Sequence, residues 1–370
     1  MILLEHGPGM QAVRFTAPSQ VVTAWRADEV LPALATLDAA RARGFWVAGY
    51  MGYEAGYALE PRLRPLMPQT EGPLLNFGIY GGPEAVGDAL AGVEPAALSA
   101  PEPMISRAEY AQAFAQVKAY IAAGDCYQIN LTFPMRARLN GTPLGLYAAL
   151  RARQAVGYGG YLDLGTGPIV ISRSPELFFT CDAQGRLEAR PMKGTAPRDA
   201  NPERDAALAR ELYESEKARA ENLMIVDLLR NDIARISQVG SVKVPKLFAV
   251  ETYATLHQMT SRITGQLLSA PSLAGLMGAL FPNGSVTGAP KIRAMEIIRE
   301  MEPFPRGAYC GGLGWMAPDG DACFNVTIRT LSLSGQDVVM NVGGAVVHDS
   351  TESGEWEEAL WKARFAQLTV

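Results

Sequence analysis

The alternation of apolar and polar residues divides this chain into a strand-rich beginning and a remainder of mixed character. Short apolar runs bounded by turn residues, at 45–50 and 75–80, predict β-strands. After Ser106, apolar residues recur every three or four positions until Gly124, which predicts a helix that Ser106 caps and the glycine ends. The pattern therefore predicts that strands come first and that a long helix opens the larger part.

A loose segment at 81–103, rich in Ala, Gly and Pro, separates these two regions and has the composition of a linker. We expect an N-terminal part over residues 1–100 that packs on the core, and a catalytic domain over 101–370. A chain of 370 residues is long enough for one large domain or for two closely packed ones.

The larger part contains several further predicted elements. Alternating or apolar runs predict strands at 126–133, 168–172, 309–315, 323–333 and 338–347. Helical spacing covers 201–236, with a break near Ser215, and a final helix runs from about 353 to 367. Strands and helices come in grouped runs with hairpin-like spacing, which favours an α+β fold with largely antiparallel sheets.

Composition and charge narrow the class of protein. Apolar residues make up 48% and charged residues 19%, a balance typical of globular proteins. The formal charge of −5, with both signs interspersed, argues against a nucleic-acid binder, which needs a basic face. The apolar runs are short and interrupted by glycine, so we expect no membrane-spanning segment and no secretory leader. The four cysteines are widely spaced and form no C-x-x-C pair, which favours a reduced cytoplasmic protein without a zinc knuckle.

Lys193 stands out in the segment 190–198, where glycine, two prolines and two arginines surround a single lysine. Gly and Pro restrict the backbone to a bend that can aim the side chain at a bound molecule. Burial and neighbouring cations lower a lysine pKa and make the free amine available as a nucleophile. The alternative is an ordinary solvated lysine, which such a motif alone usually contains.

The last helix carries Glu355, Glu358 and Lys362 at helical spacing on one face. One interpretation is a solvated face with a Glu358–Lys362 pair. The other is a Mg²⁺ site, because this ion prefers oxygen ligands and takes one or two protein carboxylates. Glu221, at the start of an apolar helix, is a plausible further carboxylate.

Other polar residues allow both a structural and a functional interpretation. Glu176 follows a strand end, where it either forms a turn or acts as a proton donor with a raised pKa. The glycine-rich loop 284–291 lacks phosphate-loop spacing, yet it leads into a helix start whose N–H groups can bind an anion. Arg329 lies in a strand-like run and needs an anionic partner if buried. His257 is either a hydrogen-bonded core residue or a ligand contact.

Taken together, segments of this sequence resemble the chorismate-utilising enzymes from about Met104 to the C-terminus. The resemblance rests on residues 124–131, 174–176, 190–198, 217–232, 281–293, 307–312, 342–344 and 349–350. It implies a four-layer α/β/β/α sandwich with large antiparallel sheets, which agrees with the α+β expectation.

The resemblance also implies roles for individual residues. Glu176 would be the general acid and Lys193 the nucleophile. Mg²⁺ would be held by Glu221 and Glu358, with Glu355 close by. Chorismate would contact a larger group, namely Gln128, Thr195, His257, Thr287, Tyr309, Arg329, Gly343, Gly344 and Lys362.

Two positions select a branch of the family. Isochorismate- and salicylate-forming members carry a lysine base where Gln128 stands, so water activation there is not expected. Members that form anthranilate usually carry alanine where Lys193 stands, whereas lysine marks the members that aminate chorismate at C4. The resemblance thus implies formation of 4-amino-4-deoxychorismate, through a covalent lysine intermediate, toward 4-aminobenzoate and folate. The anthranilate-forming branch is the alternative.

The resemblance implies a partner as well. The reaction consumes ammonia, and we find no segment that would release it from glutamine. A separate glutamine amidotransferase subunit is therefore the expected partner, with chorismate and ammonia as the small molecules bound.

Overall fold

The structure is a computed structural model that describes residues 1–253 and 256–367. Its helices are α1 (Ala27–Ala42), α2 (Ala55–Leu59), α3 (Arg107–Ala122), α4 (Pro143–Arg153), α5 (Pro202–Glu214), α6 (Glu216–Ala234), α7 (Leu273–Leu280), α8 (Lys291–Met301) and α9 (Glu352–Ala363). Short 3₁₀ turns lie at η1 (Pro8–Met10), η2 (Arg64–Leu66), η3 (Gly284–Val286) and η4 (Arg364–Ala366). No helix in these ranges is both long and apolar enough to cross a lipid bilayer.

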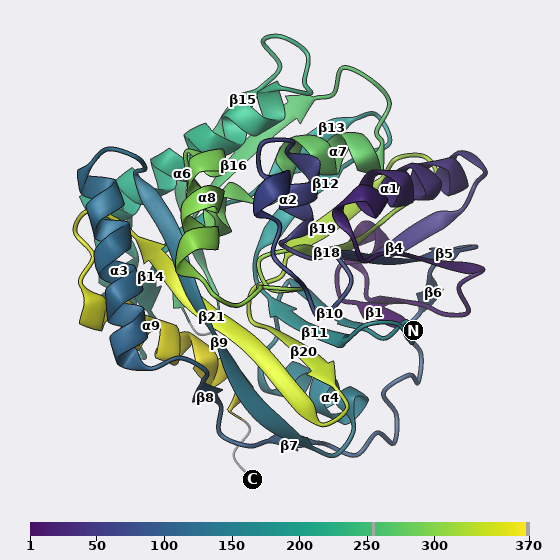
Figure 1. Ribbon diagram of the computed structural model, residues 1–370, viewed down its shortest axis with the longest axis horizontal. Coiled ribbons are helices and arrows are strands. Elements are labelled where there is room, and N and C mark those ends of the chain that lie inside the picture. Colours follow the sequence, from purple (N-terminus) through teal and green to yellow (C-terminus); the bar gives the residue numbers. More distant parts are fainter. Residues whose placement is uncertain (254–255, 368–370) are drawn as a thin grey trace.

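Two large antiparallel sheets form the centre of the molecule (Figure 1). The first, called here the β9 sheet, has the order β17 (Gly288–Ala289), β9 (Gln128–Asn140), β21 (Asp337–Val346), β20 (Thr330–Ser334), β11 (Ile169–Ser174), β10 (Tyr158–Leu162), β1 (Ile2–Leu4), β2 (Val13–Phe15) and β6 (Glu84–Ala85). Two short strands, β7 (Ala97–Leu98) and β8 (Glu102–Pro103), also pair with β9.

The second sheet, called here the β16 sheet, is also antiparallel. Its order is β14 (Met192–Pro197), β16 (Leu256–Gln266), β13 (Arg186–Ala189), β12 (Leu177–Cys181), β19 (Ala322–Val326), β18 (Gly312–Met316), β4 (Trp46–Met51), β5 (Leu75–Tyr80) and β3 (Gln20–Ala24). β15 (Lys243–Thr252) pairs with β16 as well. β13 and β14 pair with the same side of β16, and β15 pairs with its other side, so β14, which carries Lys193, continues the line of β13.

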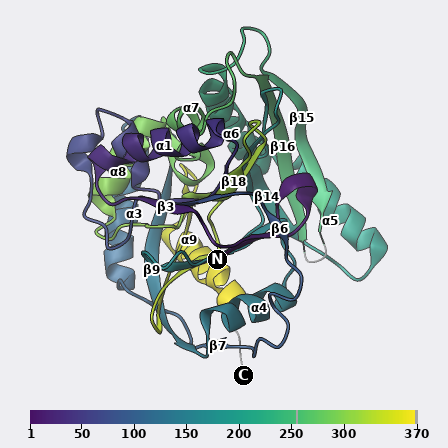
Figure 2. The same ribbon diagram turned by 90° about the vertical axis from the view of Figure 1, so that its right-hand side faces the viewer.

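Helices cover the outer faces of both sheets (Figures 1 and 2). α3, α4 and α9 pack on the β9 sheet, whereas α1 and α6 pack on the β16 sheet. Apolar side chains fill the space between the layers, because each sheet must bury its inner face. The predicted α+β sandwich with large antiparallel sheets is confirmed.

The N-terminal strands belong to both sheets. β1 pairs with β10, so it extends the β9 sheet, and β4 pairs with β18 inside the β16 sheet. Strands from before and after residue 100 therefore share the same sheets. The boundary between residues 1–100 and 101–370 stays a prediction.

Most predicted elements are present, with two differences. The run at 323–333 forms two strands, β19 and β20, because the chain leaves one sheet and enters the other between them. The segment around Lys193 is not a free bend but the strand β14, whose register shifts between Met192 and Thr195. Gly194 takes a left-handed φ of 80° there, so glycine provides a local bulge within a strand.

Candidate functional site

Glu176 and Arg329 each lie at a crossover where the chain passes from one sheet to the other. The chain leaves β11 and enters β12 through Pro175 and Glu176, and it leaves β19 and enters β20 through 327–329. The crossovers are hydrogen-bonded, because the Val326 amide donates to the Glu176 carbonyl at 3.1 Å. Ser174 fixes the first one, since its hydroxyl accepts from the Glu176 amide at 3.1 Å.

Glu176 is buried, with 5% of its surface exposed. Burial raises the pKa of its carboxyl to about 7, although a hydrogen bond from Ser285 and the charge of Lys193 act in the opposite direction. A carboxyl group with this pKa holds its proton near neutral pH and can donate it to a leaving group.

Lys193 lies on β14, which pairs with β16, and is half-buried. Its ammonium group donates to the Ser285 carbonyl oxygen at 3.5 Å. Burial is the main cause that lowers the pKa of Lys193 below its ordinary value, and the Lys362 ammonium adds to it. Carboxylates act against this lowering, in the order Glu221, Glu176 and Glu358. The charges of these four residues therefore act on the Lys193 amine, and the resemblance assigned all four to the same site.

Ser285 connects the predicted acid to the predicted nucleophile. Its hydroxyl donates to Glu176 Oε1 at 2.8 Å, while its carbonyl oxygen accepts from Lys193. The residue is 4% exposed and belongs to the turn η3 between α7 and α8. The Asn283 side chain holds this turn by accepting from the Ser285 amide at 2.9 Å.

The carboxylates of α9 gather over Gly344 on β21. A Cβ at Gly344 would lie 2.8 Å from Glu355 Oε2, 3.5 Å from Lys362 Nζ and 3.6 Å from Glu358 Oε1. Lys362 pairs with Glu358 at 2.7 Å and donates to the Gly343 carbonyl oxygen at 2.9 Å. A side chain at position 344 would fill this space, so glycine keeps it open.

The pKa values of the two α9 carboxyl groups are shifted in opposite directions. Burial would raise the pKa of Glu358, but Lys362, followed by Lys193 and Lys217, holds it below the ordinary value. Burial raises the pKa of Glu355 against a hydrogen bond from Ser350, and the Glu358 charge raises it further. Two acids so close together are expected to gain from a cation between them.

The fit of these residues to Mg²⁺ follows from their chemistry. Glu355 Oε2 and Glu358 Oε1 converge on one point above β21, and carboxylate oxygens are the ligands that Mg²⁺ prefers. Within residues 1–253 and 256–367, no three Asp, Glu, His or Cys side chains lie together so that they could hold a metal ion, so Glu221 does not join Glu355 and Glu358 in one cluster. This arrangement fits Mg²⁺, which usually takes one or two protein carboxylates and completes its shell with water and substrate oxygens.

Gln128 is fully buried at the start of β9, and both atoms of its amide group have no hydrogen-bond partner among the described residues. An unpaired buried amide costs free energy, on the order of 1–3 kcal/mol for each unsatisfied group. The strand β17 of the glycine-rich loop runs beside Gln128, with Ala289 as its direct partner. The side chain is therefore available for a polar ligand.

Arg329 is half-buried, takes a left-handed φ of 50°, and forms no ion pair within the described part of the chain. Burial lowers the pKa of its guanidinium group. A non-glycine residue in this conformation carries strain, roughly 1–3 kcal/mol, which is often found at ligand sites. Its charge is available for an anion.

Tyr309 and Thr287 are buried near the same crossovers. Burial raises the pKa of the Tyr309 phenol well above its ordinary value, so the phenol stays neutral. The Thr287 hydroxyl donates to the Asn283 carbonyl oxygen at 2.9 Å, which stabilises the loop. Their predicted contacts with chorismate stay predictions.

His257 and Thr195 are bonded away from the acid and the amine. The His257 ring nitrogens lie 2.9 Å from Thr252 Oγ1 and 2.9 Å from Asp205 Oδ1, and the ring is buried. Thr195 is exposed, and its hydroxyl lies 3.2 Å from the Gln258 side-chain oxygen. His257 thus has the hydrogen bonds of a core histidine, which is one of the two interpretations that the sequence allowed. The contacts of His257 and Thr195 with chorismate stay predictions.

Sequence reasoning missed Ser285, although it singled out the loop that contains it. Thr287 was chosen from that loop, but its hydroxyl bonds within the loop, whereas the Ser285 hydroxyl reaches Glu176. The available signal was a second hydroxyl residue among the loop glycines. Its direction depends on the turn η3, which the spacing does not predict.

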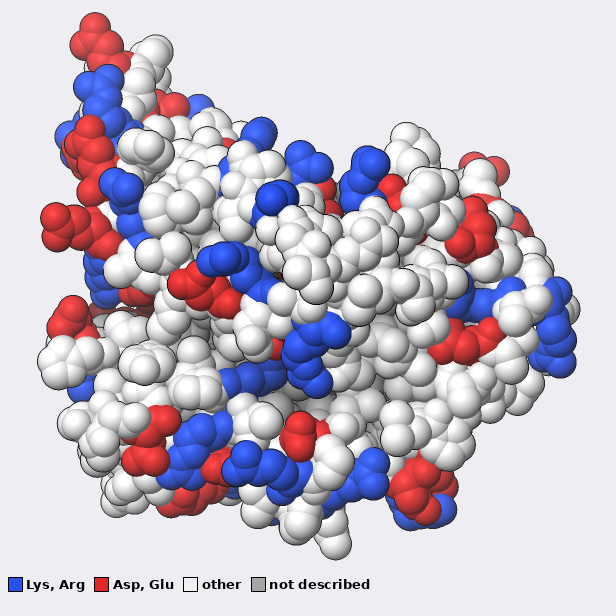
Figure 3. Space-filling model, turned by 90° about the horizontal axis from the view of Figure 1, so that it is seen from above, with Lys and Arg blue, Asp and Glu red and all other residues white. Residues whose placement is uncertain are grey.

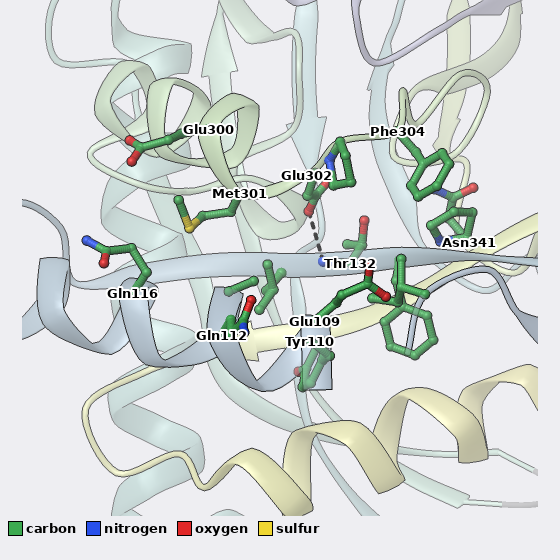
Figure 4. A pocket seen from close by; sticks show the side chains of 16 residues that line it. Glu109, Tyr110, Gln112, Gln116, Thr132, Glu300, Met301, Glu302, Phe304 and Asn341 are labelled. Atoms are coloured by element: carbon green, nitrogen blue, oxygen red, sulfur yellow. Dashed lines mark hydrogen bonds between the residues drawn. The ribbon is translucent and has the colours of Figure 1, made fainter. Parts of the chain in front are cut away.

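The surface charges and one pocket away from the predicted site residues are two further features of the molecule. Figure 3 shows Lys and Arg side chains interspersed with Asp and Glu over one face of the molecule. Figure 4 shows a separate pocket of about 300 Å³ between α3, β9 and the end of α8. Glu302 lines it and accepts a hydrogen bond from the Thr132 amide at 2.8 Å. None of the predicted site residues is among those that line this pocket.

Comparison with known proteins agrees with this geometry. The sequence profile of a family described as chorismate binding enzyme matches residues 89–367. The aminodeoxychorismate synthase component 1 of Klebsiella aerogenes is 43% identical over 258 residues, which cover 70% of this chain and 57% of that protein. The anthranilate synthase component 1 of Streptomyces coelicolor is 40% identical over 267 residues, covering 72% of this chain and 52% of that protein.

The chain thus spans about half the length of these curated relatives. Among solved structures, anthranilate synthase component I from Streptococcus pneumoniae superposes with a TM-score of 0.82 at 25% identity. The superposition covers 96% of this chain and 92% of that one, so the fold is shared over nearly the whole length.

Proposed function

The chain belongs to the chorismate-binding enzymes, and from this premise we propose that it aminates chorismate at C4 to give 4-amino-4-deoxychorismate. The observation that carries the proposal is the linked pair of Lys193 and Glu176. Ser285 joins them through its carbonyl oxygen and its hydroxyl. An amine of lowered pKa and a carboxyl of raised pKa are what nucleophilic attack with acid-assisted departure requires.

Chorismate carries two carboxylates, and the basic residues of the site suit them. Arg329 would bind the enolpyruvyl carboxylate with Tyr309, Lys362 and the backbone at Gly343 and Gly344, since its charge lacks a partner in the described chain. Thr287 and His257 would line the ring, and Thr195 would border it. The orphaned Gln128 amide would donate to or accept from the substrate.

The first chemical step would join the lysine to the ring. The neutral Lys193 nitrogen adds at C2, the C1=C2 and C5=C6 double bonds shift to C1=C6 and C4=C5, and the C4–O bond breaks. Glu176 gives its proton to the departing hydroxyl, which leaves as water, and the lysine nitrogen then loses a proton. Ammonia adds at C4 in the second step, the two double bonds shift back to C5=C6 and C1=C2, and the C2–N bond breaks as a proton of the added nitrogen passes to the departing lysine nitrogen.

Mg²⁺ belongs to this proposal as the partner of the ring carboxylate. Glu358 and Glu355 on α9, with Glu221 on α6, are the residues that would hold it. When bound, the ion offsets the negative charge of the substrate carboxylate. The charge of Glu221 raises the pKa of Lys193, and this influence supports its inclusion in the proposal.

The source of ammonia would be a separate glutamine amidotransferase subunit. The similarity to a protein named component 1 supports a second component. Free ammonium would replace that subunit in the test tube. A cytoplasmic location is proposed as well, because all four cysteines are free and buried, as is usual in a reducing compartment.

Amination at C2, which gives anthranilate, is the second candidate. The similarity to an anthranilate synthase component 1 at 40% identity favours it, and so does the shared fold. Lys193 supports C4 amination instead, because a lysine that occupies C2 would direct ammonia to C4, whereas alanine would leave C2 open.

The test is the identity of the product. Purified protein supplied with chorismate, Mg²⁺ and ammonium should form 4-amino-4-deoxychorismate, measured by chromatography with mass detection. Lys193→Ala should lose this product, while Lys243→Ala, which alters an exposed lysine on β15, should retain it. Anthranilate as the sole wild-type product, or unchanged C4 amination by Lys193→Ala, contradicts the proposal.

A further inference from the structure

The loop between β21 and α9 controls where the predicted metal carboxylates lie. It covers residues 347–350, and α9 follows with Glu355 in its first turn and Glu358 one turn later. The loop closes on itself, because the Ser350 amide donates to the Val347 carbonyl oxygen at 3.1 Å. The position of Glu355 therefore depends on how firmly this loop is held.

Lys118, on the neighbouring helix α3, holds the loop from outside. Its ammonium group donates to the carbonyl oxygens of Val347 at 3.2 Å, of Ser350 at 3.3 Å, and of His348 in a short contact. Three carbonyl oxygens satisfy the three N–H donors of a lysine. These groups belong to a loop without strand or helix partners, so the ammonium supplies bonds that regular structure would supply elsewhere.

Ser350 carries this restraint to the carboxylate. Its hydroxyl accepts from the Val347 amide at 3.1 Å and donates to Glu355 Oε1 at 2.7 Å. The residue is 8% exposed, so water competes little for this bond. With Oε1 occupied, Glu355 presents Oε2 toward the space above Gly344.

A second link between the same helices serves as a comparison. Arg107, at the start of α3, pairs with Glu352, at the start of α9, at 3.2 Å. More than half of the arginine side chain is exposed, and an ion pair of this kind contributes little, about 0–1 kcal/mol. It touches neither the loop carbonyls nor Ser350.

We propose that Lys118 is a positioning residue for the metal site: it binds the carbonyl oxygens of the loop 347–350 and, through Ser350, aims Glu355 Oε2 at the divalent cation. The inference rests on the proposed function, since it concerns the cation that Glu355 and Glu358 would hold. Groups that orient metal ligands commonly change metal affinity by about 10–100-fold when removed.

The test measures Mg²⁺ binding by isothermal titration calorimetry on the full chain without chorismate. Lys118→Ala should bind Mg²⁺ at least about tenfold more weakly than the wild type. Arg107→Ala, the matched control that cuts the exposed link between the same helices, should bind it as the wild type does.

Chemical rescue separates positioning from general damage to the fold. The three carbonyl oxygens of Lys118→Ala should accept methylammonium, which has N–H donors, and Mg²⁺ affinity should recover as methylammonium is added. Tetramethylammonium has the charge but no donor, so it should restore nothing. If Lys118→Ala is too unstable to purify, Lys118→Met fills the same space and is titrated instead.

Ser350→Ala tests the last step of the link. It should weaken Mg²⁺ binding by a similar factor, and the double variant should lose little more, since both changes interrupt one connection. Three outcomes overturn the inference but leave the proposed function standing. They are full additivity of the two losses, equal Mg²⁺ affinity of Lys118→Ala and the wild type, and equal rescue by the two ammonium ions. A wild-type protein that binds no Mg²⁺ overturns the inference and the metal part of the proposed function together.

Discussion

At the scale of single residues, the hydroxyl of Ser285 determines which oxygen of Glu176 can carry a proton. It donates to Oε1, so a neutral Glu176 holds its proton on Oε2, the oxygen that remains free to act on a substrate. The same bond stabilises the ionised form, which keeps the pKa near 7 rather than higher. Burial therefore raises the pKa of Glu176, and the Ser285 hydroxyl acts to lower it.

Ser285→Ala should move the pH dependence of the reaction. Removing a donor to the carboxylate raises the pKa of Glu176 above about 7, so the alkaline fall in kcat/KM should shift to higher pH. The measurement is kcat/KM between pH 5 and 10. Ser241→Ala is the control, since that hydroxyl bonds to the Gln238 carbonyl oxygen and not to Glu176. A limb that stays in place or shifts to lower pH would contradict the role of Ser285.

Glu176 should also leave a signature in stability. Its pKa is raised in the folded state from 4.5 to about 7, so the folded state binds the proton more tightly than the unfolded chain. Stability from this group is complete below about pH 4.5 and is lost as the pH rises through about 7.

Urea unfolding of the wild type and Glu176→Gln at pH 5 and pH 8 checks this sign. The wild type should lose up to roughly 3 kcal/mol relative to the glutamine variant over this range. Parallel pH dependence of the two proteins would mean that Glu176 is not buried as described.

The residue scale is also where sequence reasoning reached its limit. Lys193, Glu176 and Glu358 could be predicted from their residue types, because a nucleophile, a general acid and a metal ligand each need a particular functional group. Ser285 and Lys118 had no such mark. Both act through bonds to backbone or carboxylate groups from distant segments, and such contacts depend on the tertiary arrangement.

At the scale of elements, two neighbouring glycines on β21, Gly343 and Gly344, have different functions. Gly343 faces β9, where a Cβ would lie 2.2 Å from the Leu131 carbonyl oxygen, and Gly344 faces α9 and its carboxylates. One glycine is required by backbone packing and the other by the open space of the site. Their alternation follows from the two-residue period of a strand.

Alanine at each position should separate these functions. Gly343→Ala clashes with backbone and should lower the free energy of unfolding by roughly 2–4 kcal/mol, measured in urea. Gly344→Ala meets the movable end of Glu355, so the protein should keep its fold while Mg²⁺ affinity falls, measured by calorimetry. A Gly344→Ala protein with unchanged Mg²⁺ affinity would place the cation elsewhere.

Elements were predicted well where their periodicity is long and local. The helix α3, the break between α5 and α6 at Ser215, and the strand β5 all follow from spacing, caps and turn residues. β14 was not recognised, because Gly and Pro within 190–198 resemble a bend. Pairing with β16 keeps this segment extended, and such long-range pairing leaves no mark in a short stretch of sequence.

At the scale of the whole molecule, the site exists because the chain crosses repeatedly between two sheets. Glu176 and Arg329 lie at such crossovers, Lys193 lies on β14 of the β16 sheet, and the α9 carboxylates lie over Gly344 of the β9 sheet. The predicted site therefore forms only when both sheets are folded and packed against each other. The amphipathic pattern predicted the sheets, whereas the crossovers depend on strand order, which the pattern does not encode.

The interlocked sheets lead to a prediction about the N-terminal part. A fragment of residues 101–370 loses β1 and β4, which pair with β10 and β18, and exposes apolar surface between the layers. It should lack near-ultraviolet circular dichroism and bind a hydrophobic dye. A fragment that unfolds cooperatively and binds chorismate would show instead that the catalytic domain is independent.

The central claim, that Lys193 attacks the substrate while Glu176 protonates its hydroxyl, is tested most directly by mass spectrometry. The protein is incubated with chorismate and Mg²⁺ without ammonium, and the intact chain and its proteolytic peptides are weighed. We expect a mass increase of one chorismate less one water on the peptide that contains Lys193, and no increase for Lys193→Ala. Turnover with ammonium but without any adduct on Lys193, or an adduct on another residue, would contradict it.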